Sequence, residues 1–346
     1  MPKEVTKIGA LLEEVAASGG SDLHLVSGRP PYVRIDGALV PTDHPELGAK
    51  DVAELVTSLL TPVQRQRLDE TREIDFAYEV SSGDRFRMNC FWEKGNLGLA
   101  ARLIPKEIPT LDQIGLTAAM KDLLSLPNGL ILVTGPTGAG KSTTLAAMTN
   151  EINKTVAKNI VTLEDPIEFV YPLGKSLVCQ REVGSDTLSF AEGLKHALRQ
   201  DPNIILVGEM RDLETISTTL TLAETGHLVF ATLHTNNAAA TVQRMIDVFP
   251  EFQQAQVRVQ LAMTLRAVIS QQLFASPKGG RVSVREFMVN NSAVANLIRE
   301  NKPEQISTVI QTSAKAGMFT LESDIKRLVV KGLVSAEDAA RFGVRK

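Results

Sequence analysis

The stretch GPTGAGKST, Gly135 to Thr143, is the feature that most constrains this sequence. It fits the pattern G-x-x-x-x-G-K-[ST], in which glycines allow a tight loop whose backbone N–H groups point at phosphate oxygens. An apolar run of strand length, residues 130–134, comes directly before it, and a segment typical of a helix, residues 141–153, follows. Motif and context together predict a strand, a phosphate-binding loop and a helix rather than a glycine-rich turn without a ligand.

The loop also predicts its ligand. The Lys141 ammonium would neutralise charge at the β- and γ-phosphates, and the Ser142 hydroxyl would bind Mg²⁺. We therefore expect a nucleoside triphosphate with Mg²⁺, and we take it to be ATP because no guanine-reading motif is apparent. The residues expected to bind it are consecutive: Gly135, Pro136, Thr137, Gly138, Ala139, Gly140, Lys141, Ser142 and Thr143.

Further apolar runs of strand length, at 159–164, 203–208 and 227–234, alternate with longer helical stretches. This alternation predicts a parallel sheet covered by helices on both faces. The first part of the chain instead mixes short strands and helices, as expected of an α+β domain, with one hairpin turn at Asp36-Gly37. The pattern predicts four parts: an N-terminal domain (1–103), a proline-containing linker (104–115), an ATPase core (116–285) and a mostly helical C-terminal segment (286–346).

Composition excludes several classes of function. The net charge of −3 over 346 residues gives no global electrostatic case for binding nucleic acid or an acidic membrane. Cys90 and Cys179 stand far apart, which disfavours a metal cluster or a disulfide framework. The first twenty residues have the spacing of a helix rather than of a signal peptide, and no apolar run approaches the ~18 residues of a membrane span. Any membrane association is therefore expected to go through a partner protein.

Acidic residues follow two of the apolar runs, where a parallel sheet binds its ligands. Glu209 follows the run 203–208 and could hold Mg²⁺ or polarise the attacking water; the alternative is a structural pairing with Arg211 or another cation. Glu164 and Asp165 end the run that begins at residue 159, and Glu168 follows shortly after. A divalent cation would relieve the repulsion among the three carboxylates; the alternative is a solvated acidic turn.

A histidine ends the run 227–234. His234 could sense the γ-phosphate or form a hydrogen bond with an acidic neighbour. The alternative is a core histidine whose hydrogen bonds are satisfied locally.

Four segments, in this order, together resemble one family. They are GPTGAGKSTT, LEDPIEF, GEMRD and TGHLVFATLHTNN, which are similar to the Walker A loop, Asp box, Walker B segment and His box of the secretion-superfamily ATPases. The stretches FRMN, RLIP and HALRQDPNIILVGEMRDLET extend the resemblance to the type IV pilus retraction ATPases of the PilT type. The similarity covers nearly the whole chain.

The resemblance implies an α/β protein with a PAS-like N-terminal domain, a flexible linker and a RecA-like ATPase domain. It implies a cytoplasmic homohexamer at the inner-membrane base of the pilus machine, which drives pilus retraction and twitching motility through a platform protein in that membrane. A second, paralogous pilus ATPase could share the work.

The resemblance also implies roles for residues. Glu209 would be the catalytic glutamate, Glu164 and Glu168 would support metal and water, and His234 would act on the γ-phosphate side. Glu164 would assist Mg²⁺ partly through water. Arg87 and Arg102 of the N-terminal domain would reach the phosphates.

One segment departs from the family pattern. Retraction ATPases typically carry A-I-R-N-L, whereas this chain reads AVANL at 293–297, with Ala295 where the arginine is expected. An accessory retraction paralogue therefore stays open. A pilus assembly or type II secretion ATPase is less expected, because those proteins usually have an extra N-terminal domain and a four-cysteine loop.

Two other classes of protein fit the sequence less well than a motor does. A nucleic-acid translocase is disfavoured by the net charge and by the presence of only 3 Tyr and 1 Trp. A regulator that binds ATP without hydrolysing it is disfavoured because Glu209 and Lys141 are both present.

Overall fold

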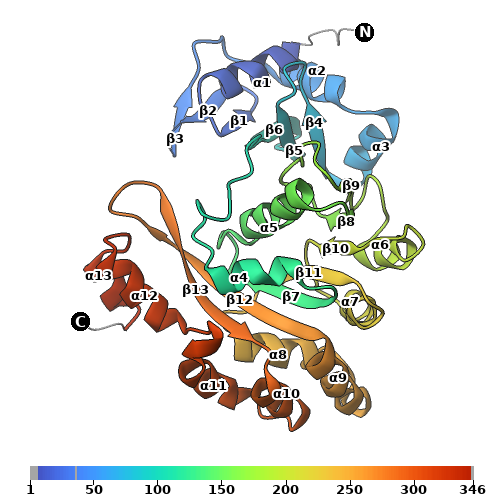
Figure 1. The fold of residues 1–346 in the computed structure, drawn as a ribbon. Coiled ribbons are helices and arrows are strands. Elements are labelled where there is room, and N and C mark those ends of the chain that lie inside the picture. The colour runs from blue at the N-terminus through green and yellow to red at the C-terminus, as the bar shows by residue number, and fades with distance from the viewer. Residues whose placement is uncertain (1–6, 36, 344–346) are drawn as a thin grey trace. The chain divides into compact units, whose positions relative to one another are not determined.

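A computed structural model describes residues 7–35 and 37–343. The chain forms two compact units, drawn in Figure 1. The first unit comprises Met1–Glu107 together with Pro166–Val170, and the second comprises Ile108–Asp165 together with Tyr171–Lys346.

The first unit is built on a six-stranded antiparallel sheet with the strand order β3-β2-β1-β6-β5-β4. Its strands are β1 (Asp22–Leu25), β2 (Tyr32–Ile35), β3 (Ala38–Pro41), β4 (Glu73–Glu79), β5 (Arg85–Glu93) and β6 (Asn96–Ile104). Its helices are α1 (Lys7–Ala17), α2 (Ala49–Leu59) and α3 (Pro62–Thr71).

Alternation of side chains explains how this sheet acquires a core. In β5, Phe86, Met88 and Cys90 are completely buried, while the residues between them face the other side of the sheet. The strands on either side of the predicted Asp36-Gly37 turn pair antiparallel, although Asp36 itself lies outside the described residues. The prediction of an α+β unit in this part of the chain is confirmed.

The second unit is built on a seven-stranded sheet with the order β13-β12-β7-β11-β10-β8-β9, in which only β13 runs antiparallel to its neighbour. Its strands are β7 (Gly129–Thr134), β8 (Asn159–Glu164), β9 (Leu177–Glu182), β10 (Ile204–Val207), β11 (Leu228–Leu233), β12 (Leu265–Ala275) and β13 (Arg281–Val289). Its helices are α4 (Ala118–Asp122), α5 (Lys141–Thr155), α6 (Phe190–Ala197), α7 (Leu213–Glu224), α8 (Ala238–Asp247), α9 (Glu251–Thr264), α10 (Ser292–Arg299), α11 (Ile306–Thr312), α12 (Leu321–Val330) and α13 (Ala336–Arg341).

Strand β7 shows that both faces of this sheet are covered. Leu130 and Leu132 pack in the cluster formed with helices α7 to α11, whereas Ile131 and Val133 pack in a second cluster with α4 and α5. All four side chains are fully buried, which accounts for the continuous apolar run in the sequence. The predicted parallel sheet with helices on both faces is confirmed.

The described part of the C-terminal segment is mostly helical, but its first residues belong to a strand. Strand β13 continues to Val289, because it pairs with β12 along its whole length from Arg281. Helices therefore begin at Ser292, with α10. Beyond the sheet, Phe274 and Val284 of this hairpin pack against Ile325 and Leu328 of α12.

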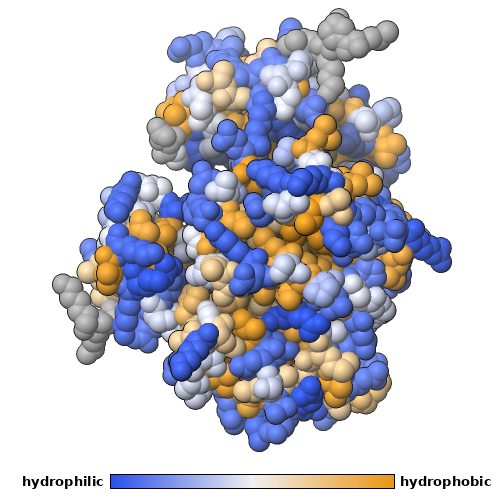
Figure 2. All heavy atoms as spheres, viewed as in Figure 1, coloured by the Kyte–Doolittle hydropathy of each residue, from blue (hydrophilic) through white to orange (hydrophobic). Residues whose placement is uncertain are grey.

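The surface carries exposed apolar side chains among polar ones. Figure 2 shows hydrophobic residues in groups separated by hydrophilic residues on the face in view. Within residues 7–35 and 37–343, no helix combines the length and the apolar character needed to cross a membrane.

Candidate active site

The loop between β7 and α5 adopts a backbone that demands glycine at its first position. Gly135 has a φ of 143°, and a Cβ atom added there would lie 2.2 Å from the carbonyl oxygen of Gln271. Gly140, directly before α5, has a left-handed φ of 82°. The first turn of α5, with Lys141, Ser142 and Thr143, is thereby placed at the end of the loop with its N–H groups available for a ligand.

The Lys141 ammonium lies inside this loop. Its Nζ donates hydrogen bonds to the carbonyl oxygens of Gly135 at 2.8 Å and of Pro136 at 3.1 Å. It also lies 3.4 Å from Nδ1 of His234, which follows β11. The positive charge is therefore held within the concave side of the loop, where phosphate oxygens would bind.

Gln271 of β12 binds the loop to the sheet, a role that no sequence motif indicates. Its amide nitrogen donates to the carbonyl oxygen of Ala139 at 2.7 Å, and its amide oxygen accepts from Thr144 Oγ1 at 2.9 Å. Gln271 is 1 % exposed, so both bonds form away from water. The only sign of it in the sequence is a short polar stretch, Ser270 to Gln272, inside the apolar segment AVISQQLF.

Glu209 lies at the centre of a charged group that joins three predicted site residues. Arg211 donates to both of its oxygens, at 2.6 Å to Oε1 and 2.8 Å to Oε2, and His234 Nε2 lies 2.9 Å from Oε1. Through His234, the carboxylate is connected to Lys141 of the loop. Burial tends to raise the pKa of Glu209, but the hydrogen bonds and charges of Arg211 and His234 outweigh it and lower the pKa below its ordinary value.

These contacts bear on the alternatives that the sequence left open for Glu209 and His234. Glu209 is paired with Arg211, and it also faces the histidine beside the phosphate loop. His234 is not a core histidine, because its side chain is 42 % exposed and contacts an acidic neighbour. An ionised carboxylate in this place can accept a proton from a water molecule.

Glu164 is the last residue of β8, and Glu209 lies shortly after the neighbouring strand β10. Strands β8 and β10 pair in parallel, with Leu163 opposite Val207, so both glutamates stand at the same edge of the sheet. Oε1 of Glu164 accepts hydrogen bonds from Thr162 Oγ1 at 2.7 Å and Gln180 Nε2 at 3.1 Å. The neighbouring strands β8, β10 and β11 thus bring Glu164, Glu209 and His234 to the carboxyl edge of the sheet. The apolar runs in the sequence predict this placement.

Three predicted site residues belong to the first unit. Glu168 lies in the segment Pro166–Val170, which groups with that unit. Arg87 and Arg102 stand directly opposite each other on β5 and β6, and Arg102 Nε donates to Asp22 Oδ1 at 2.8 Å.

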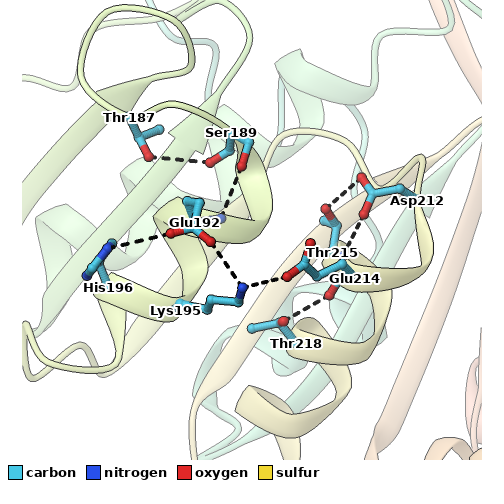
Figure 3. Close-up of polar contacts among 9 residues, drawn as sticks. All are labelled: Thr187, Ser189, Glu192, Lys195, His196, Asp212, Glu214, Thr215 and Thr218. Atoms are coloured by element: carbon cyan, nitrogen blue, oxygen red, sulfur yellow. Dashed lines mark hydrogen bonds and ion pairs between the residues drawn. The ribbon is translucent and has the colours of Figure 1, made fainter.

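Helix α7 is anchored immediately after Glu209. Asp212 caps its first turn, with Oδ1 accepting from the Thr215 N–H and Oδ2 from the Thr215 hydroxyl, both at 2.8 Å. In Figure 3, Lys195 of α6 bridges Glu192 of its own helix and Glu214 of α7. Asp212, the residue after Arg211 in the GEMRD segment, is therefore a helix cap. It fixes the turn that carries Glu209.

Side chains alone do not form a closed metal site. Among the described residues, there is no group of three or more His, Cys, Asp or Glu side chains arranged to hold a metal ion. A cation at the loop would therefore depend on oxygens of a bound phosphate compound in addition to the Ser142 hydroxyl.

A cavity of about 690 Å³ opens beside the first turn of α5. Gly140, Thr143 and Thr144 line one end of it, and residues of β12, β13 and α12 line the rest. Its volume is in the range of sites that bind small molecules.

The family described as Type II/IV secretion system protein matches residues 4–278. The chain belongs to this family. Its relatives include the type IV pilus retraction ATPase PilT of Pseudomonas aeruginosa, which is 49% identical over 96% of both chains. The twitching motility protein of Neisseria gonorrhoeae is 47% identical over 90% of this chain and 83% of its own.

One solved structure shares this fold. A pilus retraction motor PilT with bound ADP superposes with a TM-score of 0.91 and 46% identity, covering 97% of this chain and 96% of that one. The predictions of a secretion-family ATPase of the PilT type, and of a two-part α/β fold, are confirmed. The roles of the individual site residues stay predictions.

Proposed function

We propose that this secretion-family ATPase binds ATP at Gly135–Thr143 and uses its hydrolysis to drive type IV pilus retraction. The observation that carries the proposal is the connected group of Lys141, His234 and Glu209 beside the phosphate loop. It provides a cation for phosphate and a carboxylate for water within one contiguous set of contacts. The relatives named for pilus retraction and twitching motility support the direction of the motor.

The proposed hydrolysis uses these residues in sequence. Lys141 and the loop N–H groups hold the β- and γ-phosphates, and Glu209 accepts a proton as the oxygen of a water molecule attacks the γ-phosphorus. The bond from that phosphorus to the bridging oxygen breaks, which releases phosphate and ADP. His234 links the carboxylate to Lys141 and orients both groups. Arg87, Arg102 and Glu168 are proposed to contribute from the first unit.

The residues at the loop fit Mg²⁺. The Ser142 hydroxyl is a hard oxygen donor in the first turn of α5, and the Glu164 carboxylate is oriented by Thr162 and Gln180. Ser142 would hold the ion directly and Glu164 through water. Bound there, Mg²⁺ would neutralise charge on the β- and γ-phosphates.

The proposed assembly is a homohexamer at the cytoplasmic, inner-membrane base of a pilus machine, where it acts on a platform protein. Similarity to retraction motors supports this assembly and location. No nucleic acid and no membrane insertion are part of the proposal. A related pilus ATPase could work beside it.

A second function, that of an accessory retraction ATPase, is favoured by one residue. Ala295, where the family's retraction segment has arginine, is only 8 % exposed and packs in the core around α10. It changes nothing at the nucleotide loop, so an accessory protein would still hydrolyse ATP.

The deciding experiment is a count of surface pili on cells that lack this protein. A large excess of pili with loss of twitching is the result expected of the principal retraction motor. Bald cells would reverse the direction and make it an assembly motor. An unchanged pilus count would leave the accessory role and remove the principal one.

A further inference from the structure

His234 reaches two charged groups at once, and each of its ring nitrogens has a partner. Nε2 lies 2.9 Å from Oε1 of Glu209, and Nδ1 lies 3.4 Å from Nζ of Lys141. Because an ammonium can only donate and an ionised carboxylate can only accept, these partners select the tautomer with its proton on Nε2. Such a bridge tolerates little displacement, since moving the ring toward one partner moves it away from the other.

The hydrogen bonds of the sheet do not extend to His234. Strand β11 ends at Leu233, which pairs with Thr134 of β7, and His234 is the next residue. Its side chain is half-exposed, so core packing restrains the ring only in part. The turn 234–237 that carries it leads directly into α8, whose first residue is Ala238. The contacts that fix this turn therefore set the position of the imidazole.

A hydroxyl in the first turn of α8 binds this turn. Thr241 is fully buried, and its Oγ1 donates to the carbonyl oxygen of Asn237 at 2.7 Å. The Thr235 hydroxyl lies 2.7 Å from the same Oγ1. A threonine hydroxyl has a single proton, and that of Thr241 goes to Asn237, so Thr235 is the donor to Thr241. The residue next to His234 is thus bonded directly to α8.

The same threonine faces the strand that enters the phosphate loop. Oγ1 of Thr241 lies 3.4 Å from Oγ1 of Thr134, the residue directly before Gly135. Thr134 in turn lies 2.8 Å from the Ser270 hydroxyl of β12, and both residues are fully buried. These hydroxyls form one chain from β12, past the start of the phosphate loop, to the residue after His234.

Helix α8 gives this chain a fixed support. Its first N–H, at Ala238, donates to Oε1 of Glu286 at 2.8 Å, and this glutamate of β13 is buried. Asn237 caps the helix, with Oδ1 accepting from the Ala240 N–H at 2.7 Å. The start of α8 is therefore anchored to β13, and Thr241 belongs to that anchored turn.

We propose that Thr241 is a positioning residue of this site. Its hydroxyl holds Thr235, and through it the backbone of His234, so that the imidazole bridges Glu209 and Lys141. A buried hydrogen bond suits this purpose because water does not compete for it. The proposal rests on the proposed function, since it assigns a role in hydrolysis. Thr241 adds no contact to the nucleotide, and its loss should affect turnover without affecting binding.

The test removes the hydroxyl and keeps the shape of the side chain. The kcat, the KM for ATP and the ADP affinity of the full chain are measured for wild type, Thr241→Val, Thr241→Ser and the control Thr219→Val. Thr219 of α7 is also fully buried, but its hydroxyl has no partner among the described residues.

Because small displacements within an active site reduce turnover strongly, kcat should fall by about tenfold in Thr241→Val. The KM and the ADP affinity should stay within about twofold of wild type, as expected when only the transition state is affected. Thr241→Ser keeps the hydroxyl and should recover kcat. Thr219→Val should match the wild type in all three quantities.

A second variant tests the hydrogen bond itself. Thr235→Val removes the donor of the same bond from a half-buried position, so it serves even if Thr241→Val does not fold. Each single variant should lose about tenfold in kcat, and the double variant should lose no more than either, because all three lack one and the same bond. Losses that multiply in the double variant would show that the two hydroxyls act separately, and would overturn the proposal.

Other results would also overturn it. Wild-type kcat in Thr241→Val or in Thr235→Val would remove the positioning role while the proposed hydrolysis stood. A fall in ADP affinity that matches the fall in kcat, or a kcat that Thr241→Ser does not recover, would assign the effect to packing rather than to the hydroxyl. A wild type that binds ADP but does not hydrolyse ATP would instead remove the proposed function, and the positioning role with it.

Discussion

At the residue scale, the chemistry of this site depends on the two side chains that contact the Glu209 carboxylate. Arg211 holds both carboxylate oxygens, and His234 contacts one of them from the next strand. The arginine keeps the carboxylate ionised, while the histidine ties it to the lysine of the phosphate loop. The substitution Glu209→Gln would keep the size and shape of this side chain but remove the carboxylate that accepts the proton.

We therefore expect Glu209→Gln to reduce ATP turnover by at least about 100-fold, since a positioned general base typically contributes that much. Nucleotide binding should persist, because the loop and Lys141 are untouched. Phosphate release and ADP titration measure the two effects. The exposed Glu251→Gln serves as the matched control, and turnover at the wild-type rate in Glu209→Gln would exclude Glu209 as the base.

The contacts of Asp22 predict how the free energy of unfolding of the first unit changes at low pH. Burial raises its pKa, but Ser21, Arg102 and Arg34 outweigh burial and lower the pKa below 3.8. A carboxyl group with a lowered pKa in the folded state stabilises the fold above its unfolded pKa. That contribution disappears as the pH falls through the folded value.

Asp22→Asn should accordingly lower the free energy of unfolding of the first unit by about 1–3 kcal/mol at neutral pH. The difference between wild type and variant should shrink as the pH falls below about 4. Trp92 is the single tryptophan and lies in the first unit, so urea unfolding followed by its fluorescence reports on this unit. A difference that stays constant down to about pH 2 would contradict the assignment.

At the scale of elements, the phosphate loop is held between two strands that are far apart in the sequence. Gly135 follows β7 and lies against the backbone of β12, and Gln271 of β12 binds Ala139 and Thr144. The loop geometry thus depends on the close approach of β7 and β12. A single methyl group at Gly135 tests this dependence.

Gly135→Ala should destabilise the second unit by about 3 kcal/mol or more, because it adds a clash with Gln271 to an unfavourable φ. Gly138→Ala is the control: its φ is also positive, at 79°, but nothing lies within 4 Å of the added methyl group. It should cost only about 1 kcal/mol. Thermal unfolding of the two variants gives the comparison, and equal losses would show that the approach of β12 is not limiting.

At the scale of the whole molecule, the proposed work requires several copies of the chain. A ring would let each step of hydrolysis act on a neighbouring subunit, which a single chain cannot do. Sedimentation at micromolar concentration should therefore reveal a hexamer when Mg²⁺ and ATP are present. Assembly that stops at a dimer under these conditions would rule out the ring, while leaving the nucleotide chemistry of one subunit intact.

The sequence by itself determined the local features of this protein. The glycines and lysine of the phosphate loop, the buried strands β7, β8, β10 and β11, and the positions of Glu209 and His234 all follow from short patterns. Each depends on residues adjacent in the chain or on the period of a strand. Such patterns report the conformation of a segment and which residues end it.

Tertiary structure decided the contacts between distant segments. Gln271 reaches Thr144 across 127 residues, and Asp324 fastens α12 to Arg285 across 39. The hairpin of β12 and β13 was not apparent from the sequence, and its polar residues stand in otherwise ordinary apolar runs. Whether a buried glutamine or arginine has a partner depends on which strand folds beside it, and that is a property of packing rather than of local sequence.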